Sequence, residues 1–111
     1  MLKKILAFIA ISYATASAGW NQESAQVELD RVKLALATRM ETQGKTIPPN
    51  VLLEMYAFYK QATTGDMPEG TKASGPQRIM MKQAWAAKTG TSIDDAVAGY
   101  KRLAKETGDV E

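Results

Sequence analysis

The sequence contains neither cysteine nor histidine. Their absence excludes disulfides, thiol and imidazole nucleophiles, histidine general bases and the usual zinc ligand sets. Carboxylate, lysine, tyrosine and hydroxyl chemistry remain, but no pair of carboxylates stands at a fixed spacing within a strong motif. The composition therefore argues against an enzyme, and it indicates no metal and no cofactor.

Proline is also scarce, with four residues in a chain of 111, whereas 45% of the residues are hydrophobic. This balance is typical of one globular domain and not of a disordered chain. No internal repeat or low-complexity tract is present. We expect a single domain with one modest core.

Residues 1–18 have the organisation of a secretory signal peptide. Lys3 and Lys4 precede an apolar run from Ile5 to Ser12, and Ala16-Ser17-Ala18 gives a small-residue cleavage pattern. The apolar run is shorter than the roughly 20 residues that span a bilayer. We expect residues 1–18 to be removed, which leaves residues 19–111 as an exported or lumenal domain without a membrane span. The alternative is a retained N-terminal helix on a cytoplasmic protein.

The sequence lacks a concentration of charge of one sign. Removal of residues 1–18 takes away Lys3 and Lys4 but no acidic residue, so basic and acidic residues become equal in number. Nucleic-acid binding needs a concentrated basic face, which interspersed charges do not supply. The same neutrality weakens a third possibility, an amphipathic bundle that acts at membranes.

Apolar periodicity predicts two helices in the first half of the domain. The first, roughly Gln22–Met40, has steps of three and four residues along the stripe Ala25, Leu29, Val32, Leu36 and Met40. A loop with Gly44 and the pair Pro48-Pro49 follows, and Asn50 is the candidate N-cap of the next helix. The second helix ends at Gly65, and its stripe is Leu52, Met55, Tyr56, Tyr59 and Ala62.

Two more helices follow an exposed loop at Asp66 to Gly75. The third begins at Pro76, carries the apolar residues Ile79, Met80, Ala84 and Trp85, and stops at Gly90. Ser92 and Asp95 form a capping-box-like start of the fourth, and Gly108 is near its end. The apolar stripe of the fourth helix is Ile93, Ala96, Val97, Tyr100, Leu103 and Ala104.

The run from Met55 to Asp66 resembles the signature of the acyl-CoA-binding protein family. It contains the long and specific pattern Tyr-Lys-Gln-Ala-Thr-x-Gly-Asp at residues 59–66. Further pairs and runs follow in the family's order and spacing: Val32-Lys33 before it, and Ala84-Trp85, Gly90-Thr91-Ser92, Asp95-Ala96 and Tyr100 after it. The resemblance covers about Gln22 to Glu106.

The resemblance implies an all-α, four-helix, up-down-down-up bundle that binds long-chain fatty acyl-CoA in a bowl formed by its second, third and fourth helices. It implies that Tyr56 and Lys60 bind the ribose 3′-phosphate, that Tyr59 contacts the adenine, and that Tyr100 lines the bound ester. Lys33 is a further implied ligand contact. The physics agrees, because a phenol and an ammonium four residues apart on a helix can converge on one phosphate.

Other side chains are expected to have no role in ligand binding. We expect Leu52, Trp85, Val97 and Leu103 to belong to the core. The charged pairs Asp94-Asp95 and Lys101-Arg102 are expected to be solvated helix surface.

The sequence departs from the family in the third helix. Counting back from Trp85, the family's second phosphate-binding lysine aligns with Met81, and a family tryptophan aligns with Lys82. Arg78 lies three residues before Met81, so either Arg78 or Lys82 is a candidate replacement cation. The connection between the first two helices is longer than the family's, and the loop before the third is shorter.

Two functional hypotheses follow from these observations. In the first, the protein carries and buffers acyl-CoA esters. In the second, it keeps the fold but serves as a structural or partner-binding module with weak or no ligand affinity. Met81 and the leader favour the second hypothesis, and the intact signature of the second helix favours the first.

Overall fold

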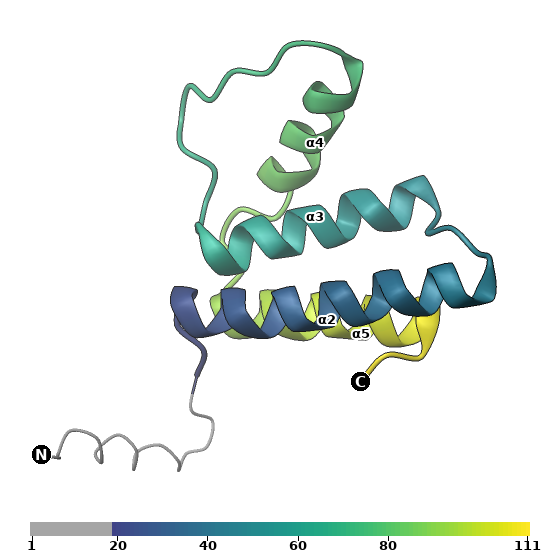
Figure 1. The fold of residues 1–111 in the computed structure, drawn as a ribbon. Helices are drawn as coiled ribbons and strands as arrows, with labels where there is room; N and C mark the ends of the chain where they lie inside the picture. Colours follow the sequence, from purple (N-terminus) through teal and green to yellow (C-terminus); the bar gives the residue numbers. More distant parts are fainter. Residues whose placement is uncertain (1–18) are drawn as a thin grey trace, which may run out of the picture.

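A computed structural model describes residues 19–111, so the predicted leader at residues 1–18 lies outside the described part. The described chain is all-helical. Its helices are α2 (Gln22–Gln43), α3 (Pro49–Thr63), α4 (Pro76–Ala86) and α5 (Ile93–Gly108) (Figure 1). The predicted four-helix class is confirmed.

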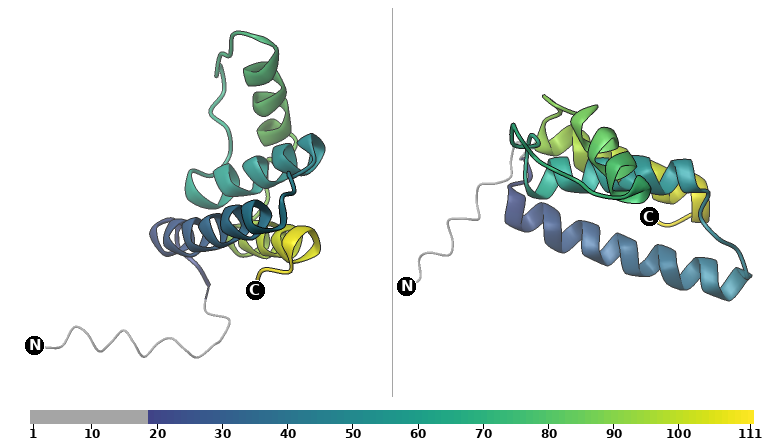
Figure 2. Two further views of the ribbon diagram at one scale, coloured as in Figure 1. Left: turned by 45° about the vertical axis from the view of Figure 1, so that its right-hand side comes forward. Right: turned by 90° about the horizontal axis from the view of Figure 1, so that it is seen from above.

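Three of the helices form a packed body, and the fourth packs against only one of them. Helices α2 and α5 lie side by side and run in the same direction, while α3 runs the opposite way across them (Figures 1 and 2). Helix α4 contacts α3 and no other helix of residues 19–111. Residues of α3 and α4 together line two hollows.

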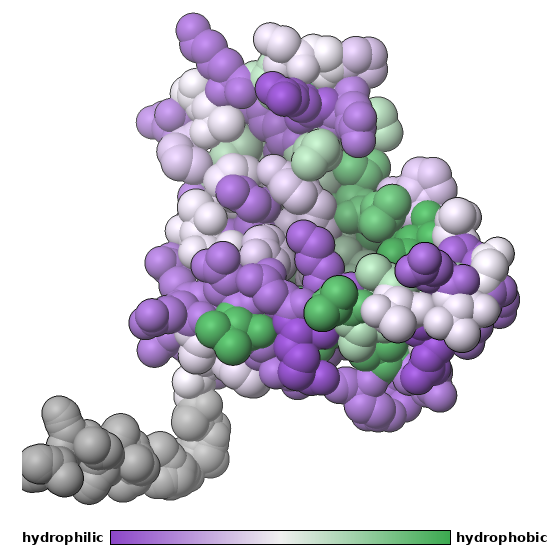
Figure 3. Space-filling model, viewed as in Figure 1, coloured by the Kyte–Doolittle hydropathy of each residue, from purple (hydrophilic) through white to green (hydrophobic). Residues whose placement is uncertain are grey.

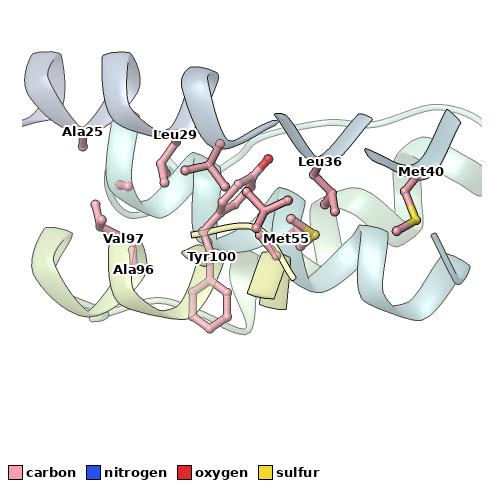
Figure 4. Close-up of a cluster of buried hydrophobic side chains, with 13 residues drawn as sticks. Ala25, Leu29, Leu36, Met40, Met55, Ala96, Val97 and Tyr100 are labelled. Atoms are coloured by element: carbon pink, nitrogen blue, oxygen red, sulfur yellow. The ribbon is translucent and has the colours of Figure 1, made fainter. Parts of the chain in front are cut away.

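The core lies between α2, α3 and α5 (Figure 4). The predicted α2 stripe is confirmed, because all five of its residues are buried. The other helices contribute Met55, Phe58 and Ala62 from α3 and Ala96, Val97, Tyr100 and Ala104 from α5. Burial of these apolar side chains is what holds the three helices together.

The starts of α2 and α5 match the expected positions, whereas the predicted cap of α3 does not. Asn21 and Ser24 form a capping box at the start of α2, and Ser92 Oγ accepts from the backbone N–H of Asp95, as predicted. The predicted N-cap at Asn50 is wrong, because Pro49 is already the first helical residue. A proline fits there, since the first helical N–H needs no partner within the helix.

Helix α4 is shorter and less buried than predicted. It ends at Ala86, before the turns that lead to Gly90. Ile79 is 41% exposed and Met80 is 49% exposed, so Trp85 is the single buried residue of this helix. The predicted apolar stripe fails to be buried because α4 packs against one helix only.

The core assignments are confirmed for Trp85 and Val97, which are buried, and Leu103 packs half-buried against the core. The assignment of Leu52 is wrong: half of its surface is exposed, because it lines two hollows beside α3 instead of packing within the core.

Two of the four charged residues predicted to be solvated surface on α5 make contacts with the N-terminal part of the described chain. Lys101 Nζ lies 2.7 Å from Glu28 Oε2 on α2, and Asp94 Oδ1 accepts a hydrogen bond from the backbone N–H of Trp20. These contacts tie α5 to the start of the described chain. Asp95 and Arg102 are exposed, as expected.

Within residues 19–111, no helix has both the length and the apolar character needed to cross a membrane.

Candidate functional site

Three hollows adjoin one another around Tyr56. The cationic pocket, of about 360 Å³, is lined by Tyr56, Thr71, Lys72, Ala73, Ser74, Arg78, Met81, Lys82 and Trp85. The tyrosine pocket, of about 440 Å³, is lined by Lys33, Leu36, Ala37, Ile47, Leu52, Met55, Tyr56, Tyr59, Lys60 and Tyr100. The methionine groove, of about 530 Å³, is lined by Pro49, Leu52, Leu53, Tyr56, Pro76, Gln77, Met80 and Met81. Since Tyr56 lines all three, they form one composite site.

Helix α3 places its residues on this site through its packing. Met55 and Phe58 point into the core on one side of the helix and fix its rotation. Tyr56, Tyr59 and Lys60 then fall on the neighbouring face, where each is half-buried. A polar tip on an apolar body suits such a position, because the ring or stem is covered while the tip reaches solvent.

The tyrosine pocket brings together five of the seven predicted site residues: Lys33, Tyr56, Tyr59, Lys60 and Tyr100. The rings of Tyr59 and Tyr100 lie 6.2 Å apart between centroids, and Lys33 Nζ lies 5.5 Å from the Tyr59 ring. The Tyr59 hydroxyl donates to Asp30 Oδ1 at 2.8 Å. The hydroxyl of Tyr59 is thus engaged on α2, and its ring remains to line the pocket.

Both of these phenols have a raised pKa. Burial raises the pKa of Tyr100 to about 12, with smaller contributions from Tyr59 and Asp30. Burial also raises the pKa of Tyr59, and the hydrogen bond to Asp30 adds to this effect. Neither phenolate is therefore available as a base at neutral pH.

Lys60 lies where the tyrosine pocket approaches the cationic pocket. Its Nζ is 4.6 Å from the centroid of the Trp85 ring, and Trp85 lines the cationic pocket. The indole Nε1 donates to the carbonyl of Gly65 at 2.9 Å, which holds the ring in place. A fixed aromatic face orients the ammonium of Lys60 without neutralising its charge.

The cationic pocket contains the other two predicted residues, Arg78 and Lys82, together with Lys72. No acidic side chain lines it. Lys72 comes from the loop at residues 64–75, and sequence analysis missed it because a lone loop lysine carries no periodic signal. Three positive charges without a lining carboxylate favour an anion in this pocket.

The methionine groove has the opposite character. Leu52, Leu53, Met80 and Met81 give it a mostly apolar wall between α3 and the first half of α4. Figure 3 shows hydrophobic side chains gathered at this junction. Met81 lines the groove and the cationic pocket alike, so the two environments meet at this residue.

Part of the signature run is structural. Gln61 is buried, and its Nε2 donates to Asp66 Oδ1 at 2.5 Å and to the carbonyl of Thr91 at 3.3 Å. Asp66 Oδ1 also accepts from the backbone N–H of Gly90 at 2.8 Å, which contributes to lowering the pKa of Asp66. These residues join the end of α3 to the turn between α4 and α5. The sequence did contain one signal of this structural role: a glutamine, Gln61, lies three residues after Phe58 and therefore on the face of α3 that is buried.

Comparison with known proteins gives one match. A family model described as "Acyl CoA binding protein" matches residues 19–104. No curated protein and no solved structure matches the chain.

Proposed function

Because the chain belongs to the acyl-CoA-binding protein family, we propose that it binds long-chain fatty acyl-CoA esters and carries them without catalysing a reaction. The observation that carries this proposal is the position of Tyr56. It lines the cationic pocket and both of the largely apolar hollows, the tyrosine pocket and the methionine groove. An acyl-CoA ester has the same division, with phosphates at one end and a fatty chain at the other.

The requirements of the ligand support particular roles for the site residues. Phosphates need cations and hydroxyl donors, which Tyr56, Lys60 and Lys82 offer. The adenine needs an aromatic face, and the Tyr59 ring offers one because its hydroxyl is held by Asp30. Tyr100 is buried at the base of the tyrosine pocket, where it would contact the ester through its ring. Lys33 stands at the α2 side of the same pocket and would meet an anionic group there.

One of the two arguments for a structural module, beside the leader, was the loss of a cation at position 81. Lys72, Arg78 and Lys82 supply three cations to the pocket that Met81 lines, which favours a ligand carrier. The apolar groove beside them would be an exposed liability in a purely structural module.

The test is calorimetric titration of residues 19–111 with palmitoyl-CoA and with free CoA. We expect the ester to bind clearly more tightly than free CoA, because the apolar hollows add contact with its chain. Heat from neither ligand would contradict the proposal, and so would equal affinity for both.

Two variants extend the test to the assigned residues. Lys60→Ala removes a charge-assisted hydrogen bond of about 1.5 to 3 kcal/mol and should weaken palmitoyl-CoA binding about tenfold or more. Tyr56→Phe removes one hydroxyl and should cost about 1 kcal/mol. Lys45→Ala is the matched control, because Lys45 is an exposed lysine that lines none of the three hollows. Circular dichroism checks that each variant is folded.

A further inference from the structure

Three cations of the cationic pocket have no ionic partner within residues 19–111. The ion pairs of this part of the chain engage Arg31, Lys88, Lys101, Arg102 and Lys105. Lys72, Arg78 and Lys82 form none of them, although all three line one pocket of about 360 Å³. An anion bound among them would relieve the repulsion between neighbouring positive charges.

The three cations come from two separate elements. Arg78 and Lys82 are four residues apart on α4, so they lie on one face of that helix. Lys72 belongs to the loop at residues 64–75 and approaches the same pocket from outside the helix. An anion between them would therefore be held from two directions.

A turn in the loop positions Lys72. The backbone N–H and the hydroxyl of Thr71 both donate to the carbonyl of Pro68, at 3.2 and 2.6 Å. Gly70, inside this turn, has a φ of 83°, which favours glycine. The turn ends at Thr71, and residues 71–74 then run along the pocket wall, where Ser74 adds a hydroxyl.

The donor set fits a phosphate group better than a single carboxylate. A phosphate offers several oxygens and up to two negative charges, so it can accept from an ammonium, a guanidinium and hydroxyls at once. Tyr56 and Ser74 complete the set with neutral donors. Met81, which also lines this pocket, has no donor to offer.

We propose that Lys72 binds a phosphate group of the nucleotide together with Arg78 and Lys82, so that the loop supplies a cation in place of the one missing at position 81. This inference rests on the proposed function. The phosphate could belong to the ribose 3′-phosphate or to the pyrophosphate, and the experiment separates the two.

The experiment compares Lys72→Ala with the wild-type domain by titration with CoA, 3′-dephospho-CoA and adenosine 3′,5′-bisphosphate. We expect Lys72→Ala to weaken CoA binding about five- to tenfold, as fits the loss of one partly solvated charged contact. An equal loss for 3′-dephospho-CoA assigns the contact to the pyrophosphate. A loss confined to CoA and the bisphosphate assigns it to the 3′-phosphate.

Two controls isolate the contact from general charge effects. Lys45→Ala removes the same charge outside the pocket and should change CoA affinity less than twofold. Lys72→Arg keeps a cation and should restore most of the affinity. If Lys72→Ala matches Lys45→Ala for all ligands, the inference is overturned.

Failure of the inference and failure of the proposed function give different results. Tight palmitoyl-CoA binding that is insensitive to Lys72→Ala overturns only the role of Lys72. Bisphosphate binding that depends on Lys72, without any preference for the palmitoyl ester, supports the phosphate pocket and overturns acyl carriage.

Discussion

Met81 stands where the cationic pocket meets the methionine groove. Compared with the lysine that the family has at this position, a methionine removes a charge from the cationic pocket and adds apolar surface to the methionine groove. Its two cationic neighbours differ in exposure, because Lys82 is half-buried in the pocket wall and Arg78 is exposed near the start of α4. A half-buried ammonium is the better-placed phosphate ligand, since less solvent competes for it.

Substitutions on α4 should therefore have graded effects. Lys82→Ala should weaken palmitoyl-CoA binding at least tenfold, and Arg78→Ala should weaken it less. Met81→Lys should strengthen binding. The gain in affinity should be larger for free CoA than for the ester, because the methionine groove loses apolar surface. Titration calorimetry of the three variants measures these changes. Three unchanged affinities would mean that α4 does not contact the phosphates.

Glu28 is a charged residue with a structural role outside the site. Hydrogen bonds from Arg31 and Lys101, both of which end on its carboxylate, hold the pKa of Glu28 at about 2. A carboxyl whose pKa is lower in the folded state than in the unfolded state stabilises the fold above its unfolded pKa. The stabilisation is lost as the pH falls toward its folded pKa.

Glu28→Gln should therefore reduce the free energy of unfolding by about 1 kcal/mol at pH 7, since both ion pairs are partly exposed and screened. The difference from wild type should shrink as the pH falls below about 4. Urea unfolding at a series of pH values measures it. Glu41→Gln, at an exposed residue of the same helix, should show no such dependence, and an equal loss at every pH for Glu28→Gln would refute the argument.

The signature run shows what residue-level prediction can and cannot reach. The pattern identified Tyr56, Tyr59 and Lys60, and the structure places all three on the composite site. It did not separate them from Gln61 and Asp66, which join α3 to the turn at Gly90 and Thr91. Which residues of the run contact the site and which have a structural role depends on a turn far along the chain, so local periodicity does not predict it.

At the scale of helices, periodicity predicted α2 and α5 well because both bury one continuous stripe against two neighbours. It failed for α4 and for Leu52. An apolar stripe predicts which face is buried only if another helix covers it, and α4 leaves Ile79 and Met80 uncovered. Leu52 and Met80 line the methionine groove, so these two errors of the prediction coincide with the candidate site, whereas Ile79 lines none of the three hollows.

Helices α3 and α5 approach closely at a glycine. A Cβ built on Gly99 would lie 2.6 Å from the Phe58 ring, closer than any real contact. Gly99→Ala should therefore destabilise the domain by about 1 to 2 kcal/mol, because overpacking outweighs the gain in helix propensity. Urea unfolding measures this loss.

A second substitution tests the cause. Phe58→Leu shortens the opposing side chain, so the double variant should cost less than the two single changes together. Additive costs would show that the clash with the Phe58 ring is not the reason why Gly99→Ala destabilises the domain.

At the scale of the whole molecule, the described chain is one body of α2, α3 and α5 with α4 held at its side. The leader predicted at residues 1–18 would precede this body. We propose that it directs export or lumenal delivery and is then removed, which fits a family match that begins at residue 19.

Protein purified from its native source should accordingly begin at Gly19. The small residues Ala16 and Ala18 suit cleavage at this position. N-terminal sequencing or intact mass measures it. An intact Met1 would instead support a cytoplasmic protein that keeps these residues.

The attachment of α4 to a single neighbour has a consequence for motion. Elements with few buried contacts open locally at a lower free energy than the whole fold, and their backbone amides exchange with solvent accordingly. The amides of α4 should exchange fastest among the four helices. A bound ester that touches both α3 and α4 would act as a second attachment, so slower exchange in α4 would report occupancy, with α2 as the unchanged reference in the same sample.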